Sequence, residues 1–185
     1  MKKSPESTDQ ALSALRRRID GLDGRIVGLL NQRTRLAMAI GRIKHQRGDA
    51  VFTPGREREV VRRVAEASQG PLRADELRAI YREIMSVALS FEGGLTVAVW
   101  KGDGAAARLA VRQRLGECTR IKAVPTVIAL ANALLRGSAD FILVSPAAWT
   151  ALSARAGSAN WVVADRVRVA GVSGTFRLLS AKVKA

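Results

Sequence analysis

An arginine stands where the repeat of apolar residues predicts isoleucine or leucine. Arg33 falls in a series of positions spaced by seven residues, between Ile26 and Ile40. Burial of an unpaired guanidinium would be costly, so an anion or a carboxylate is expected to meet it. Periodicity alone leaves a second interpretation equally open, in which a polar residue fixes helix register or oligomeric state.

Two further cations lie on the same predicted helix. Lys44 follows Arg33 by eleven residues, about three helical turns, and therefore points to the same side. The pair indicates a site for two carboxylates; for Lys44 alone, the ordinary interpretation is a solvated charge favouring the helix dipole. Arg16 lies roughly 25 Å from Arg33 along a helix. Arg16 and Arg33 can therefore grip one small molecule only if Arg16 comes from a second subunit, and otherwise Arg16 is surface charge.

The elements that must position these cations are helical. Two series of residues, each with a spacing of seven, predict one helix over about 9–45. The first series is Leu12, Ile19, Ile26, Arg33 and Ile40, and the second is Leu15, Leu22, Leu29, Leu36 and Ile43. A helix of roughly 50 Å cannot bury this stripe within a small monomer, so it requires a partner chain. Two shorter helices are expected over 53–68, with Thr53 as N-cap before Pro54, and over 74–92.

The second half of the chain alternates between strand and helix patterns. Strands are expected at 95–100, 120–124, 141–144, 161–169 and 175–180, and helices at 105–115, 126–136 and 146–156. This alternation predicts a small α/β layer with a largely parallel sheet. The charge balance and the periodicity of apolar residues both change near Gly93-Gly94. The predicted domains are therefore 1–92 and 95–185, and the predicted fold class is α + α/β.

Composition narrows the classes of function. The 185 residues are 48% hydrophobic, enough for a core, and carry a formal net charge of +15, which attracts anions. The single cysteine, Cys118, and the single histidine, His45, argue against disulfides, cysteine-based zinc clusters and a Ser/His relay, and neither is expected to have special chemistry. No apolar leader or membrane-length stretch is recognisable, so a cytoplasmic protein that uses no membrane is expected.

Several short runs together carry a family resemblance. They are Leu15-Arg16, Ile19-Asp20, Leu22-Asp23, Leu30, Arg33, Leu36-Ala37, Gly41, Lys44, Arg56-Glu57-Arg58-Glu59 and Tyr81-Arg82-Glu83-Ile84-Met85-Ser86. Their order and spacing over about 10–92 resemble the all-helical AroQ-type chorismate mutases, above all the mutase domain of bifunctional mutase–prephenate dehydratases. The resemblance implies an intertwined homodimer of three-helix protomers with a long first helix. It also implies cofactor-free Claisen rearrangement of chorismate to prephenate, in the biosynthesis of phenylalanine and tyrosine.

The resemblance also implies roles for individual residues. Arg33 and the partner subunit's Arg16 would bind the two carboxylates, and Lys44 would reach a carboxylate and the ether oxygen. Glu57 would accept from the ring hydroxyl, or else serve as a first-turn carboxylate that favours the helix dipole. Arg56 is expected to be a structural ion-pairing residue.

Two positions depart from the usual family pattern, and a third affects how the site would work. Thr53 stands where the family usually has Asp; its hydroxyl preserves the helix cap but weakens any contact with the substrate hydroxyl. Ala88 replaces a serine and removes one donor to a carboxylate. Glu92 occupies a Gln or Glu position, and a glutamate donates to the ether oxygen only when protonated, which burial would favour.

The second half more weakly resembles the first lobe of a prephenate dehydratase. The matching runs are Thr96–Trp100 and Ala133–Pro146. The family's glycine-rich turn is replaced by Trp100–Gly104, and its Glu-Asn after the proline by Ala147-Ala148. A shortened, catalytically inactive module is therefore expected, which packs on the mutase dimer or binds a ligand, with packing alone favoured. Trp100, Trp149 and Trp161 are expected in the core rather than as stacking platforms.

Three other functions remain open at this point. An isochorismate–pyruvate lyase resembles the mutases in its cationic pocket. A non-catalytic dimer that binds or regulates another enzyme would explain the losses at Thr53 and Ala88. A nucleic-acid-binding module would use the positive charge, but aromatic residues make up only 4% of the chain and no recognised nucleic-acid motif is present. The favoured partner is a small dicarboxylate, with no metal and no cofactor.

Overall fold

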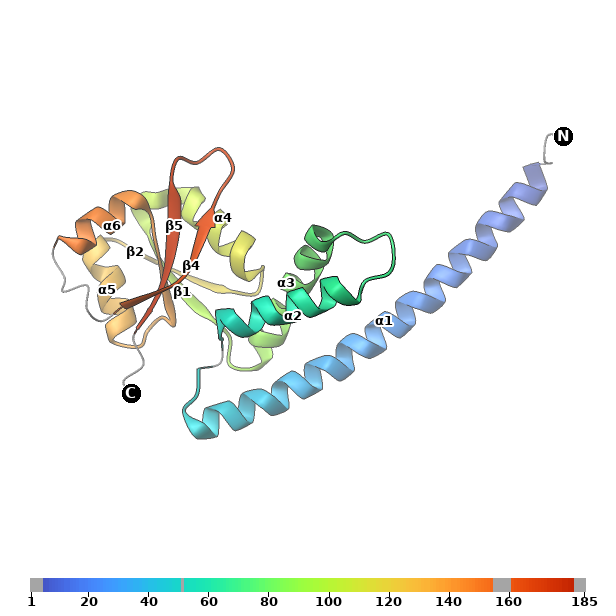
Figure 1. Ribbon diagram of the computed structural model, residues 1–185, viewed down its shortest axis with the longest axis horizontal. Coiled ribbons are helices and arrows are strands. Elements are labelled where there is room, and N and C mark those ends of the chain that lie inside the picture. Colours follow the sequence, from blue (N-terminus) through green and yellow to red (C-terminus); the bar gives the residue numbers. More distant parts are fainter. Residues whose placement is uncertain (1–4, 51, 155–160, 182–185) are drawn as a thin grey trace.

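A long helix, two shorter helices and a small mixed sheet follow one another along the chain (Figure 1). The computed structural model describes residues 5–50, 52–154 and 161–181. The helical region comprises α1 (Pro5–Arg47), α2 (Pro54–Ala67) and α3 (Ala74–Phe91). The sheet region contains β1 (Thr96–Trp100), the short 3-10 helix η1 (Lys101–Asp103), α4 (Gly104–Leu115), β2 (Arg120–Val124), α5 (Val127–Leu135), β3 (Phe141–Val144), α6 (Pro146–Ser153), β4 (Trp161–Arg168) and β5 (Thr175–Ala181). The fold class is α + α/β, as predicted.

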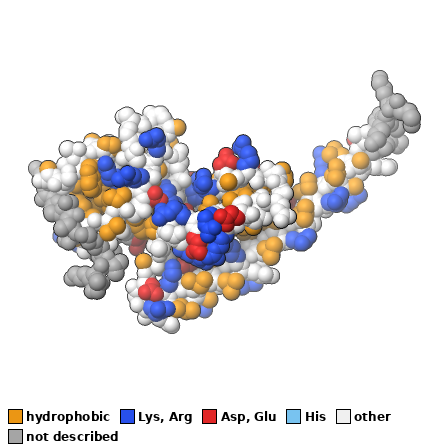
Figure 2. Space-filling view, viewed as in Figure 1, with side chains coloured by type: hydrophobic (Ala, Val, Ile, Leu, Met, Phe, Trp, Pro, Cys, Tyr) orange, Lys and Arg blue, Asp and Glu red, His pale blue; other side chains and the backbone are white. Residues whose placement is uncertain are grey.

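The apolar stripe of α1 is uncovered along most of its length. The helix packs against α3 near its C-terminal end and projects away from the rest of the chain toward its N-terminus (Figure 1). Its stripe residues are 44–67% exposed, and they are Leu12, Leu15, Ile19, Leu22, Ile26, Leu29, Leu36, Ile40 and Ile43. Figure 2 shows apolar side chains alternating with Lys and Arg along this helix. The predicted long helix is confirmed, and a single chain does not bury its apolar stripe.

The start of α2 is set by its backbone. Thr53 is the N-cap residue, with φ −130° and ψ 110°, and Pro54 follows in the first turn, as predicted. The carbonyl of Thr53 accepts hydrogen bonds from the backbone N–H groups of Arg56 and Glu57. Its hydroxyl makes no capping hydrogen bond, so the expectation that this side chain caps the helix is wrong.

The five strands lie in the order β2-β1-β3-β5-β4. β1 pairs in parallel with β2 and β3, whereas β5 pairs antiparallel with both β3 and β4. The prediction of a largely parallel sheet is thus wrong for its second half. α4 and α5 provide the crossovers that parallel pairing needs, but β4 and β5 are joined by a short turn in which Gly171 and Gly174 adopt positive φ, and they form a hairpin.

The sheet has a core on each face. α4 covers one face, and α5 and α6 cover the other; Val97 and Val99 of β1 point to the first, and Ala98 points to the second. Phe52, just before α2, is buried in the first core and meets Phe141 edge to face at 5.6 Å between ring centroids. A Phe buried in this way stabilises the fold by roughly 1.5–3 kcal/mol. It also joins the helical region to the sheet region.

The three tryptophans pack against the second core, as predicted. Trp100, Trp149 and Trp161 are partly buried there, and the indole N–H of Trp100 donates to the carbonyl of Pro125 at 3.2 Å. The guanidinium of Arg177 stacks on Trp149. Over the described residues, no helix is both long and apolar enough to cross a lipid bilayer.

Candidate active site

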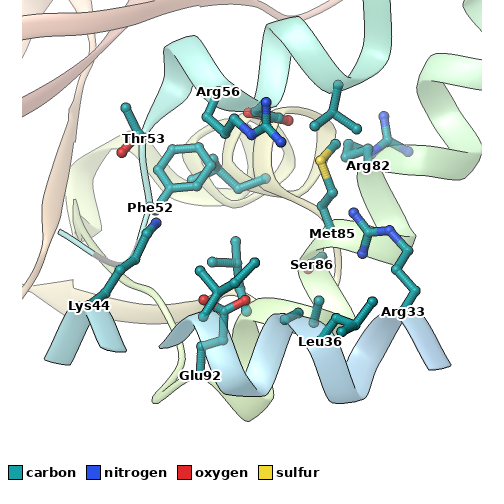
Figure 3. Close-up of a pocket in the computed structure, with 17 residues that line it drawn as sticks. Arg33, Leu36, Lys44, Phe52, Thr53, Arg56, Arg82, Met85, Ser86 and Glu92 are labelled. Carbon is teal, nitrogen blue, oxygen red and sulfur yellow. The ribbon is translucent and has the colours of Figure 1, made fainter. Parts of the chain in front are cut away.

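A cavity of about 490 Å³ opens between the three helices and the end of α4 (Figure 3). This volume lies within the range typical of small-molecule sites. Six of the residues singled out in the sequence line it, and they are Arg33, Lys44, Thr53, Glu57, Ala88 and Glu92. The structure therefore brings together residues that are separated by up to 59 positions in the chain.

The two cations of α1 lie at opposite ends of the cavity. Figure 3 shows Arg33 and Lys44 flanking it, with Leu36 between them on the same helix. Three helical turns separate Arg33 from Lys44, so both side chains share one face of α1. Both are half-buried, and Arg33 makes no ion pair or hydrogen bond with another described residue. Its guanidinium is therefore available to an anion in the cavity.

Arg16 lies elsewhere. It is exposed on the projecting part of α1 and does not line the cavity of its own chain. The seventeen residues between Arg16 and Arg33 correspond to roughly 25 Å of helix, which is too far for one small molecule to bridge. Any contribution of Arg16 to such a cavity has to come from a second copy of the chain.

Glu92 places a carboxyl group between the two cations (Figure 3). Burial raises the pKa of Glu92 above the ordinary glutamate value, and the opposing effects of Lys44 and Arg33 are smaller. The side chain fits because residue 41 is glycine: a Cβ on buried Gly41 would lie 2.8 Å from the Cγ of Glu92. Gly41 thus lets the end of α3 approach α1 closely enough to place Glu92 in the cavity.

Glu57 is held by a residue of the sheet region. The Nη1 of Arg114, in α4, donates to the Oε2 of Glu57 at 2.6 Å, and its Nε donates to the Oδ2 of Asp165 at 2.6 Å. Burial alone would lower the pKa of Arg114, but the two carboxylates outweigh burial and raise it, so the guanidinium stays charged. Glu57 also lies in the first turn of α2, where a negative charge favours the helix dipole.

Thr53 and Ala88 contribute little polarity. Thr53 is exposed at the cavity edge, and its hydroxyl makes no hydrogen bond to another described residue. Ala88 is 3% exposed and adds only an apolar wall.

Further cavity residues were missed by the sequence reasoning. Arg56 forms the predicted ion pair, with Glu59 at 2.7 Å, but it also lines the cavity, as do Phe52, Arg82 and Ser86. Their spacing carries a signal: Arg82 and Ser86 are one helical turn apart, so they share a face of α3.

Charge on the cavity wall is predominantly positive. Its cations are Arg33, Lys44, Arg56 and Arg82, and its carboxyl groups are Glu57 and Glu92. Such a wall attracts a small molecule with two negative charges. No cluster of three or more potential metal ligands from His, Cys, Asp and Glu occurs within the described ranges.

Three helices and the end of α4 thus enclose a cavity whose ionisable wall residues are mostly cationic. Residues 15–93 match the family "Chorismate mutase type II", so this part of the chain is a chorismate mutase type II domain. The resemblance stated from the sequence over 10–92 is confirmed.

Curated relatives match a longer stretch. The bifunctional chorismate mutase/prephenate dehydratase of Neisseria gonorrhoeae is 33% identical over 141 residues, which are 76% of this chain and 38% of the relative. That of Aquifex aeolicus is 38% identical over 93 residues, which are 48% of this chain and 26% of the relative. The 141-residue match is longer than the 79 residues of the 15–93 segment, so it extends into the sheet region. The chain spans less than two fifths of the length of these relatives.

Among solved structures, a chorismate mutase (form II) from Thermus thermophilus is 30% identical. The match covers 45% of this chain and 94% of that one, with a TM-score of 0.44.

Proposed function

We propose that the chain is a chorismate mutase that converts chorismate to prephenate. The observation that carries the proposal is the cavity itself, in which Arg33, Lys44, Glu57 and Glu92 meet within a chorismate mutase type II domain. Chorismate is an extended dicarboxylate, and the cationic wall suits two carboxylates. The rearrangement is intramolecular, so a site that compacts the substrate and stabilises charge on the breaking ether oxygen suffices.

Each residue then has a role in one step. Arg33 and the partner subunit's Arg16 bind the two carboxylates and hold the substrate in its compact conformer. Lys44 contacts a carboxylate and the ether oxygen, where negative charge grows as the bond breaks. Glu57 accepts a hydrogen bond from the ring hydroxyl. Protonated Glu92, which lies between Arg33 and Lys44, also donates to the ether oxygen.

The direct test uses the purified full chain with three substrates. Chorismate is expected to disappear with formation of an equal amount of prephenate. Isochorismate is expected to yield no pyruvate, and prephenate is expected to yield no phenylpyruvate. If chorismate stays at the uncatalysed rate, or if isochorismate is the better substrate, the proposed function is wrong.

Activity should depend on the protonation of Glu92. Because burial raises the pKa of this carboxyl group, its protonated form persists to higher pH than for an ordinary glutamate. Only that form donates, so kcat/KM should fall as pH rises through the Glu92 titration, by about tenfold per pH unit beyond it. The Glu92→Gln variant keeps a donor at every pH and should lose this descending limb. A pH–rate profile of the variant that still follows the wild type would remove Glu92 from this role.

Gly41 should be required for the position of Glu92. A Cβ at residue 41 would lie 3.0 Å from the Cβ of Glu92 and 3.4 Å from its Cα, so α1 and α3 must separate or Glu92 must turn away. The Gly41→Ala variant is expected to lose at least about tenfold in kcat/KM, since small displacements in a preorganised site are costly.

Gly24→Ala is the matched control for this change. Gly24 is in the same helix with nothing within 4 Å of a Cβ. It should keep wild-type kinetics and gain up to about 1 kcal/mol of helix stability. Equal kinetics for the two variants, with thermal unfolding confirming that both fold, would contradict the role of Gly41.

The exposed stripe of α1 supports a homodimer as the active form. Its apolar residues run over nearly the whole helix at 44–67% exposure. A row of exposed apolar side chains along a helix of this length indicates an interaction site. A second copy lying along α1 would cover the stripe and bring its own Arg16 toward the cavity of the first.

For the sheet region we propose an accessory role without dehydratase activity. Ala147 and Ala148 stand in α6, where the dehydratase-like pattern has Glu-Asn. The proposed division into domains 1–92 and 95–185 falls at Gly93 and Gly94, both with positive φ. Side chains from both regions nonetheless share one core through Phe52, which supports a packing role.

A further inference from the structure

The ion pair between Arg114 and Glu57 is built with little freedom. Two nitrogens of the Arg114 guanidinium, Nε and Nη2, both lie 2.6 Å from the Oδ2 of Asp165, which leaves Nη1 to reach the Oε2 of Glu57 at 2.6 Å. The side chains of Arg114 and Glu57 are only 16% and 12% exposed. Charge-assisted bonds of this length, shielded from water, fix the orientation of both groups.

Arg114 approaches Glu57 from outside the cavity described above. A second cavity, of about 770 Å³, is lined by both residues of the pair; Glu57 also lines the first cavity, whereas Arg114 lines only the second. The bond uses Oε2 of Glu57, and Oε1 makes no hydrogen bond to another described residue. The guanidinium of Arg114 therefore does not line the cavity proposed for substrate. Oε1 of Glu57 remains free to accept a hydrogen bond from a substrate.

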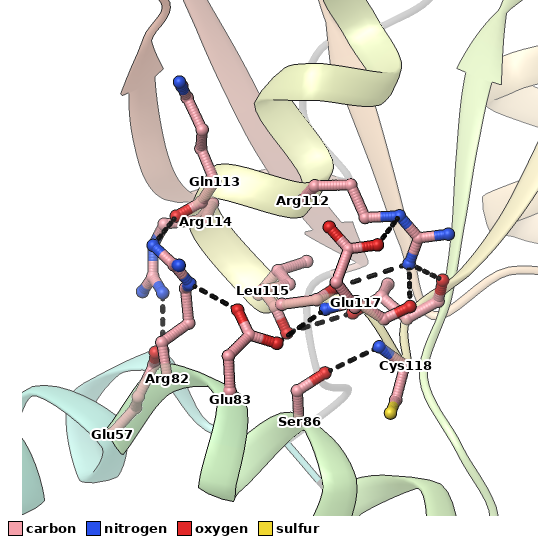
Figure 4. Close-up of polar contacts among 12 residues, drawn as sticks. Glu57, Arg82, Glu83, Ser86, Arg112, Gln113, Arg114, Leu115, Glu117 and Cys118 are labelled. Carbon is pink, nitrogen blue, oxygen red and sulfur yellow. Dashed lines mark hydrogen bonds and ion pairs between the residues drawn. The ribbon is translucent and has the colours of Figure 1, made fainter. Parts of the chain in front are cut away.

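The helix that carries Arg114 is itself fixed against α3 (Figure 4). Arg82 donates from Nη1 to the carbonyl of Gln113 at 3.1 Å. Glu83 accepts from the backbone N–H of Glu117, and Ser86 from that of Cys118, each at 3.0 Å. These contacts dock the end of α4 and the turn after it onto the face of α3 that lines the cavity.

Leu115 and Gly116 complete this junction. Leu115, the residue after Arg114, lines the cavity. Gly116 has φ +82°, and a Cβ there would come within 2.5 Å of the Cβ of Ser86. The sheet region thus forms part of the cavity wall in addition to packing beside it.

From this arrangement we infer that Arg114 is a positioning residue for the proposed mutase site, supplied by the sheet region. It holds the Glu57 carboxylate in one orientation, with Oε1 toward the substrate hydroxyl, and balances its charge so that a dianionic substrate is not repelled. The inference rests on the proposed function. It gives the sheet region a part in the reaction although that region carries none of the other residues proposed to act on chorismate.

The test is a double-mutant cycle on the full chain. Arg114→Met is expected to lower kcat/KM for chorismate by about tenfold or more, because it leaves a largely buried carboxylate without its partner. Arg114→Lys keeps the charge but not the fixed geometry of the guanidinium donors, so it should recover only part of this loss. In a Glu57→Gln background, Arg114→Met should change kcat/KM by less than about twofold, since its effect passes through the carboxylate.

Two further variants sharpen the result. Arg108→Met, at an exposed position of the same helix, should keep wild-type kinetics. Asp165→Asn removes the second anchor of Arg114 but keeps the guanidinium. It should lower kcat/KM several-fold in the wild-type background and leave it unchanged in the Glu57→Gln background. If thermal unfolding shows that Arg114→Met does not fold, Asp165→Asn replaces it in the double-mutant cycle with Glu57→Gln.

The failures are distinguishable. If the wild-type chain makes no prephenate, the proposed function and this inference both fail. If the wild-type chain is active and Arg114→Met retains its kcat/KM, the inference alone is wrong. The same holds if Arg114→Met loses as much activity in the Glu57→Gln background as in the wild-type background, because a merely structural role acts equally in both.

Discussion

Replacing Arg33 with methionine is expected to lower kcat/KM for chorismate by about a hundred- to a thousandfold. A loss of this size is typical when a site loses one preorganised hydrogen-bond donor that stabilises an anionic transition state. Arg33 lies at one end of the cavity and makes no ion pair or hydrogen bond to another described residue, so its guanidinium is open to the substrate. Methionine keeps an unbranched, helix-compatible side chain and removes the charge. The loss should therefore appear in activity and leave the thermal unfolding midpoint close to the wild-type value.

A matched control separates this site from general charge effects. Arg35 is exposed on the same helix two positions on, and it does not line the cavity. Arg35→Met removes the same charge and should change kcat/KM by less than about twofold, since exposed charges are largely screened. Similar losses in the two variants would mean that Arg33 acts through net charge or helix register, not by binding a carboxylate.

Local patterns predicted the elements well, because each depends on residues close together in sequence. The two seven-residue series of α1 predicted a helix over 9–45 that is found over Pro5–Arg47. Thr53-Pro54 correctly marked the start of α2 through the fixed φ of proline. The same reasoning assigned the cap to the Thr53 hydroxyl, which makes no such bond because side-chain orientation is not set by residue type alone.

Strand pairing was predicted less well, because it is a property of the whole sheet. The strand patterns at 161–169 and 175–180 predict further members of an alternating α/β layer. No helix separates them, and the two glycines of the intervening turn, Gly171 and Gly174, allow the reversal that makes a hairpin. The missing crossover was visible in the sequence and favoured antiparallel pairing from the start.

Some contacts of the candidate site could likewise be predicted from the sequence, and others could not. Arg33 and Lys44 were placed together by helical spacing, while Glu57 and Glu92 joined them through the family resemblance. Neither spacing nor resemblance predicted that Arg114 would meet Glu57, because 57 residues separate them and the contact depends on how α4 docks on α2 and α3. Phe52 was missed for a similar reason, since its partner Phe141 lies in a strand.

These contacts give the sheet region two effects on the helical region. Its core receives Phe52, next to the start of α2, and its helix α4 fixes Glu57 one turn further on. Both act on α2, the element that carries Arg56 and Glu57 into the cavity, whereas the uncovered stripe belongs to α1. The sheet region therefore leaves the proposed dimer contact of α1 uncovered, while it fixes the cavity wall that α2 forms.

The second large effect is expected when two inactive variants are combined, because mixed dimers of the two should recover part of the activity. If each site takes Arg33 from one subunit and Arg16 from the partner, Arg16→Ala and Arg33→Ala homodimers are both defective at every site. A mixed dimer has one site with both substitutions and one site with neither. Equal amounts of the two variants, unfolded together and refolded, should form mixed dimers in half of the population, so the mixture should recover about a quarter of wild-type activity.

The exposed stripe of α1 and the position of Arg16, roughly 25 Å from Arg33 along the helix, make this the expected outcome. The measurement is prephenate formation by the mixture, compared with each variant refolded alone and with wild type treated in the same way. Refolding Arg33→Ala with Arg33→Met is the control, and it should recover nothing because every site lacks Arg33. Recovery in the control, or a mixture no more active than its parts while wild type refolds fully, would contradict a site shared between subunits. A chain that sedimented as a monomer at assay concentrations yet turned over chorismate would do so as well, because one protomer holds Arg16 too far from Arg33 for both to bind a single substrate.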